Sequence, residues 1–183
     1  MNNILNLLEP LLPKTFDQNE IFVLLIMVLC ICIFVIVHHL DPQLLQTEII
    51  ALFVFNILFS TVGDRMLAEP PLDLYDTLDY GHGELFDSVL QILVYPIPVI
   101  LYIHFYQKYN PNKIVSIVLY AFVLVLLEWT SEKFFNVFQY KEWKIVYSYG
   151  FYCFALALNL LFAGLIKRLI GREQSKKRSS ANS

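Results

Sequence analysis

The chain has 183 residues, 57% of them hydrophobic, and its formal net charge at pH 7 is −3. A soluble domain is typically about 45–50% apolar, so this excess and the mean hydropathy of +0.58 predict a membrane protein. The weak net charge disfavours nucleic acid as a partner, because chains that bind it carry clustered excess Lys and Arg.

The apolar residues are gathered in long blocks, which is the pattern of membrane-spanning helices. Residues 1–20 carry leucines on one side of a short helical pattern, and this predicts an interfacial amphipathic segment. A membrane domain over 21–168 follows, and the residues 169–183 are predicted to form a basic, disordered tail. The predicted fold class is all-α, a polytopic bundle of about five transmembrane helices at 21–40, 48–68, 84–106, 113–134 and 145–167.

Two of these helices carry irregularities that indicate contacts. In the second helix, Asn56, Ser60 and Gly63 recur at helical spacing, and small or polar residues on one face are typical of a helix–helix contact in lipid. In the third helix, Pro96 and Pro98 each remove a backbone donor. Because such breaks survive in lipid only where protein or water satisfies the backbone, we expect a kink that faces the bundle interior.

The segments between the helices are polar or aromatic. The stretch 72–80 alternates acids with apolar residues, which predicts a short surface helix, and 133–144 is expected to be a mixed-charge, aromatic loop. An aromatic belt at the membrane interface is predicted from Trp129, Trp143 and Tyr147.

Lys and Arg are distributed unevenly between the two predicted membrane faces. The face that carries the C-terminus has eight of them, and the face that carries the N-terminus has five. Basic residues are retained on the cytoplasmic side, so we expect a cell-membrane protein with its N-terminus outside and its C-terminus in the cytoplasm. The basic tail is expected to bind anionic lipids, and no cofactor is predicted.

Several charged residues fall at one depth, near the outer face of the predicted bundle. Asp64 follows Glu48 by sixteen residues and Glu128 follows Lys113 by fifteen, which puts both carboxyl groups roughly 23 Å from the inner surface. We expect a polar shelf in the outer third of the membrane, formed by Asp64, Arg65, His82, Glu84, Asp87 and Glu128. A carboxylate in an apolar helix needs a partner, and the shared depth makes Arg65 the expected partner of Glu128.

Three functions fit such a shelf. In the first, it is structural, and the chain is a non-enzymatic structural or interaction protein whose partner is a larger membrane protein or a second copy of the chain. In the second, the shelf binds or transports a cation, a proton or a small solute beside the proline break. In the third, His82, Glu84 and Asp87 bind a metal for intramembrane chemistry. The first is favoured because a charge near the membrane interface costs well below the ~2.5–3.5 kcal/mol of the mid-bilayer. The spacing in the third matches no recognised zinc motif, so no catalytic residue or metal ligand is assigned.

Short motifs along the membrane domain are shared with a known family. In chain order they are Val62-Gly63-Asp64, an acidic loop with prolines, Val94-Tyr95-Pro96, Glu128-Trp129, and Trp143 with Tyr147-Ser148. Over residues 48–168 the chain resembles a family of small, uncharacterised multi-helix integral membrane proteins of spore-forming Firmicutes. The resemblance implies a helix bundle in a bacterial plasma membrane and, from the hosts of the family, a role around sporulation or envelope stress. It transfers no catalytic role.

Overall fold

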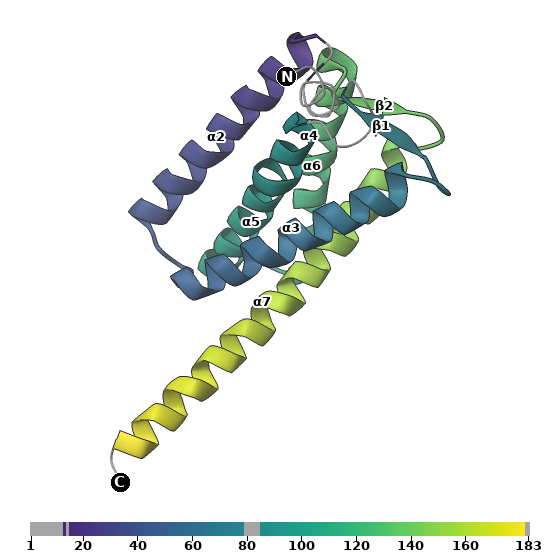
Figure 1. Ribbon diagram of the computed structural model, residues 1–183. Coiled ribbons are helices and arrows are strands. Elements are labelled where there is room, and N and C mark those ends of the chain that lie inside the picture. Colours follow the sequence, from purple (N-terminus) through teal and green to yellow (C-terminus); the bar gives the residue numbers. More distant parts are fainter. Residues whose placement is uncertain (1–12, 14, 79–84, 182–183) are drawn as a thin grey trace, which may run out of the picture.

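The structure is a computed structural model that describes residues 13, 15–78 and 85–181, with side chains described as far as 173. In chain order its elements are α2 (Gln18–Leu40), α3 (Gln46–Ala68), β1 (Tyr75–Thr77), α4 (Leu85–Val89), η2 (Leu90–Val94), α5 (Pro96–Tyr109), α6 (Lys113–Phe135), β2 (Phe138–Tyr140) and α7 (Ile145–Ala181). The helix α4, the π-helical turn η2 and the helix α5 form one span, Leu85–Tyr109. Figure 1 shows the spans side by side, with α7 extending well beyond the others toward the C-terminus.

The described residues form five spans, and each is long and apolar enough to cross a membrane. Large apolar side chains such as Leu25, Val62 and Ile114 are exposed on the outer faces of the helices. Water would disfavour such a surface, whereas lipid tails solvate it. The prediction of an all-α, multi-pass membrane protein is therefore confirmed.

Several helix ends differ from the predicted boundaries, among them the start of α2 and the end of α7. The helix α2 begins earlier because Asp17 caps it: the Asp17 carboxylate accepts from the Asn19 N–H (3.1 Å), and the Glu20 carboxylate accepts from the Asp17 N–H (2.7 Å). The helix α7 continues to Ala181, where the sequence predicts a disordered tail. Extending a nucleated helix through Lys, Arg, Gln and Ala costs little, and no proline interrupts this segment. Most of the predicted interfacial segment 1–20 lies outside the described residues.

The third span changes its hydrogen-bonding pattern directly before Pro96. The Tyr95 N–H donates to the Leu90 carbonyl (2.9 Å), which is a π-helical bond one residue longer than the α-helical bond. This shift takes the usual donor away from the Gln91 carbonyl, and the Ser60 hydroxyl of α3 donates to it instead (2.9 Å). The proline break predicted from the sequence is thus accommodated by a π-helical turn and a donor from the neighbouring helix.

Amide and small side chains join α3 to α7. The side-chain amides of Asn56 and Asn159 donate to each other, at 2.7 and 3.1 Å, and both residues are buried. Farther along α3, Gly63 lies against Phe151, because a Cβ at Gly63 would be 3.6 Å from the Phe151 Cζ. The face predicted from Asn56, Ser60 and Gly63 is therefore a helix–helix contact.

Two short strands form a ribbon across the end of the bundle where α3 and α6 end and α7 begins (Figure 1). The strands are antiparallel, and the residue partners are Tyr75 with Tyr140, Asp76 with Gln139, and Thr77 with Phe138. Side chains alternate along a strand, so the first and third pairs share one face of this ribbon. The predicted surface helix over 72–80 is wrong in its described part, because β1 lies there.

Candidate functional site

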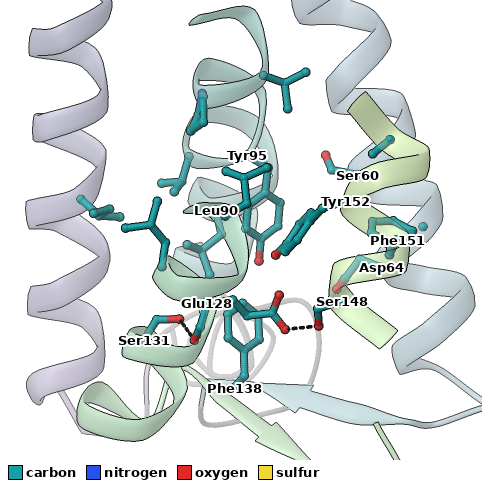
Figure 2. Close-up of a pocket in the computed structure, with 18 of the residues that line it drawn as sticks. Ser60, Asp64, Leu90, Tyr95, Glu128, Ser131, Phe138, Ser148, Phe151 and Tyr152 are labelled. Carbon is teal, nitrogen blue, oxygen red and sulfur yellow. Dashed lines mark hydrogen bonds between the residues drawn. The ribbon is translucent and has the colours of Figure 1, made fainter. Parts of the chain in front are cut away.

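A cavity of about 410 Å³ lies inside the bundle, and residues of α2, α3, η2, α5, α6 and α7 line it. Most of its lining is apolar. Its charged and most of its hydroxyl-bearing side chains gather beneath the ribbon, at what we call the polar end: Asp64, Tyr75, Tyr95, Glu128, Tyr140, Trp143, Ser148 and Tyr152. Figure 2 shows the Tyr95 and Tyr152 hydroxyls directed toward the place where Glu128 lies. The volume falls within the range of small-molecule sites, about 300–1,000 Å³.

Hydroxyl groups hold Glu128 of α6 at the polar end. Its Oε1 accepts hydrogen bonds from the Tyr140 hydroxyl (2.5 Å) and from the Ser148 hydroxyl (2.6 Å). The Trp143 Nε1–H donates to the Ser148 Oγ (2.8 Å), which leaves the Ser148 proton directed at Glu128. The carboxylate is therefore stabilised by charge-assisted hydrogen bonds from uncharged donors.

Arg65, the expected partner of Glu128, lies elsewhere. Its Nε pairs with the Glu69 Oε1 one turn along α3 (3.1 Å), and its side chain is 73% exposed. Neighbouring residues of a helix point about 100° apart, so Arg65 faces outward while Asp64 lines the cavity. The prediction of an Arg65–Glu128 pair is wrong, because two side chains at one depth meet only if they also face each other.

Asp64 brings a second carboxylate to the cavity. Its Oδ1 accepts from the Tyr75 hydroxyl (2.8 Å), and its Oδ2 accepts from the Gln91 side-chain amide (2.9 Å). The same Gln91 nitrogen donates to the Asp87 Oδ2 (3.1 Å). One amide thus links the two aspartates, and the structure brings Asp64, Asp87 and Glu128 to the same end of the bundle.

The ribbon supplies one tyrosine to each carboxylate of the cavity. Tyr75 of β1 donates to Asp64, Tyr140 of β2 donates to Glu128, and the two tyrosines are opposite each other in the register. Burial, followed by the charges of the neighbouring carboxylates, raises the pKa of both hydroxyls above the ordinary tyrosine value. Both tyrosines therefore remain protonated donors at physiological pH.

The structure places the two prolines of the predicted break but not two residues of the predicted shelf. His82 and Glu84 lie outside the described residues. Pro96 begins α5, and the Pro98 carbonyl accepts a hydrogen bond from the Tyr120 hydroxyl of α6 (2.8 Å).

The three aromatic residues predicted at the interface take different places. Trp129 and Tyr147 are exposed. Trp143 instead lines the cavity, where its indole N–H is used by Ser148.

The cavity reaches the side of the bundle between α2 and α6. Leu29 and Ile33 of α2 and Leu127 of α6 line it, yet they are 52%, 39% and 46% exposed. Side chains that face both a cavity and the outside mark an opening. Because these residues belong to apolar spans, the opening faces lipid.

Sequence reasoning missed the hydroxyl groups that hold the two carboxylates. The available signal was the alternation in Tyr75-x-Thr77 and Phe138-x-Tyr140, which is typical of a half-buried strand. Each strand has only three residues, so the pattern is too short to identify either strand or its partner.

The fold and site define a multi-pass, all-α membrane protein with a cavity inside its bundle. Within residues 13, 15–78 and 85–181, no group of three or more His, Cys, Asp and Glu side chains is placed to hold a metal ion. No family model, curated protein or solved structure matches the chain. Its function is therefore inferred from the cavity.

Proposed function

We propose that the protein is a non-enzymatic membrane protein of the interaction type that binds a small amphipathic molecule in its central cavity. The observation that carries this proposal is the contrast within the cavity, which has apolar walls along most of its length and two carboxylates with hydroxyl groups at one end. Ligand sites typically combine apolar walls with a few convergent polar groups.

The position of the opening supports the same function. Leu29 and Leu127 flank a gap between α2 and α6 that faces lipid. A molecule dissolved in the membrane can enter sideways there, place its polar head at the polar end and keep its apolar part against the cavity walls. The apolar part then never crosses water, which would oppose its transfer.

A purely structural role explains the cavity less well. Polar groups that serve stability alone are expected in a closely packed core, because protein interiors leave few voids and unfilled volume costs stability. The open volume beside Glu128 is a feature that a ligand would fill and a packing role would not require.

The test is chemical extraction of the purified protein. Ala155 is buried and lines the cavity, so phenylalanine there fills part of the apolar volume. We expect organic extracts of the wild type to contain one small molecule in near-stoichiometric amount and extracts of Ala155→Phe to lack it, as measured by mass spectrometry. Val118→Phe adds the same ring at an exposed position of α6 and is the matched control. Extracts that do not differ between the two variants would contradict the proposal.

We also propose that the ribbon end of the bundle faces outward and the C-terminus lies in the cytoplasm, because more Lys and Arg lie at the C-terminal face. Single cysteines at positions 76 and 175 test this in a chain without its native Cys30, Cys32 and Cys153. An impermeant thiol reagent applied to intact cells is expected to label Asp76→Cys and spare Ser175→Cys. The opposite pattern would reverse the orientation.

A further inference from the structure

Glu128 lies at the polar end, and no cationic side chain among the described residues pairs with it. None of the described residues that line the cavity is Lys, Arg or His. The ion pairs among the described residues do not include Glu128, whose partners are hydroxyl groups. Hydroxyl donors stabilise a carboxylate but leave its charge in place, and in surroundings of low dielectric constant that charge attracts a cation strongly.

The surroundings of Glu128 favour an organic cation over a metal ion. Tyr95 and Tyr152 direct their rings to this end of the cavity (Figure 2), and the rings of Tyr140 and Trp143 line it beside Glu128 and Ser148. Such rings attract ammonium groups through their π faces. A metal ion such as Ca²⁺ needs several convergent oxygen ligands, with carboxylates prominent among them, and no three Asp, Glu, His or Cys side chains of the described residues are placed to hold one.

Resting on the proposed function, we propose that the ligand is a single-chain cationic amphiphile, with a primary ammonium head and no anionic group. The head pairs with the Glu128 carboxylate among the aromatic rings, and the alkyl chain follows the apolar walls toward the opening between α2 and α6. An ethanolamine phospholipid offers the same ammonium, but its phosphate would lie beside two carboxylates. Like charges at close range oppose binding, so this second source of the ammonium is disfavoured.

The two tryptophans provide a reporter for this proposal. Trp143 lines the cavity, whereas Trp129 is exposed on the outside of α6. In Trp129→Phe the fluorescence comes from Trp143, and in Trp143→Phe it comes from Trp129, which reports partition into the detergent micelle. The probes are dodecylamine, dodecanol and a single-chain ethanolamine phospholipid, each with a quenching bromine close to its head group.

We expect the brominated amine to quench Trp143 saturably and at least about tenfold more tightly than the alcohol, with no saturable quenching of Trp129. Equal binding of amine and alcohol would overturn the cationic class and leave the proposed function standing. An absence of saturable Trp143 quenching by every probe would overturn both. Binding of the phospholipid as tightly as the amine would overturn the exclusion of an anionic group.

A variant pair then assigns the effect to Glu128. Glu128→Gln removes the charge and keeps an acceptor for the Tyr140 and Ser148 hydroxyls. We expect it to weaken amine binding about tenfold to one hundredfold while alcohol binding stays unchanged, which also shows that the cavity is intact. Glu132→Gln removes a charge one turn farther along α6, outside the cavity lining, and is expected to bind the amine as the wild type does. An unchanged amine affinity in Glu128→Gln would overturn the proposal.

Discussion

Replacing Glu128 by alanine is expected to lower the free energy of unfolding by about 2–4 kcal/mol in detergent. The change removes the acceptor of the Tyr140 and Ser148 hydroxyls in a part-buried site, and each donor left unsatisfied away from water costs about 1–3 kcal/mol. Glutamine retains an acceptor oxygen and loses only the charge-assisted part of these bonds. Glu128→Gln is therefore expected to cost about 1 kcal/mol. Denaturant titrations of the purified variants measure both effects.

Arg65→Ala is the comparison that separates this explanation from an ion pair across the bundle. The Arg65 guanidinium is exposed and pairs with Glu69 on its own helix, so its removal is expected to cost no more than about 0.5 kcal/mol. The Arg65→Ala, Glu128→Ala double variant should lose the sum of the two single-variant changes in unfolding free energy, because the two side chains share no partner. A large loss in Arg65→Ala, with strong non-additivity in the double variant, would restore the pair that the sequence predicts.

Replacing Tyr75 or Tyr140 by phenylalanine is expected to lower stability by about 2 kcal/mol each, because a hydrogen bond to a charged group contributes about 1.5–3 kcal/mol. The ribbon should loosen as well, since these two hydroxyls join it to α3 and α6. We therefore expect faster hydrogen exchange at the Leu78 N–H, which donates to the Val137 carbonyl beside the strands. Tyr147→Phe is the matched control, because Tyr147 is exposed. Unchanged exchange in both ribbon variants would contradict the role of the tyrosines.

The same two tyrosines predict a direction for the effect of pH. Their pKa is raised in the folded chain by burial and by the nearby carboxylates, so the folded state keeps protons that the unfolded state loses near pH 10. Their contribution to stability is complete below about pH 10 and is lost progressively as the pH rises further. Each Tyr→Phe variant should reduce this alkaline loss.

The helices follow from the sequence because each apolar block is long enough to span lipid. A chain of this size has no water-soluble core that could bury all of these blocks instead. The contact face of Asn56 and Gly63 follows as well, since small and polar residues have few other uses in a membrane helix. The place where the helix α7 ends does not follow, because polarity predicts exposure to water and does not by itself exclude helix. Residues 169–181 are both polar and helical.

The candidate site shows what residue counts along the helices cannot predict. Counting residues along each helix brings Asp64 and Glu128 to one level, and both line one cavity in the structure. The same count also selects Arg65, whose side chain points away from the cavity. Helix rotation and the pairing of two distant three-residue strands decide which groups reach Glu128, and neither is encoded in local periodicity.

The central claim is that the cavity, with Glu128 at its polar end, holds a small molecule taken up from the membrane. The measurement that tests it most directly is the molar ratio of extractable small molecule to protein in the wild type, Ala155→Phe and Val118→Phe. A ratio near one is expected for the wild type and Val118→Phe, and a ratio near zero for Ala155→Phe. The same ratio in all three proteins would contradict the claim.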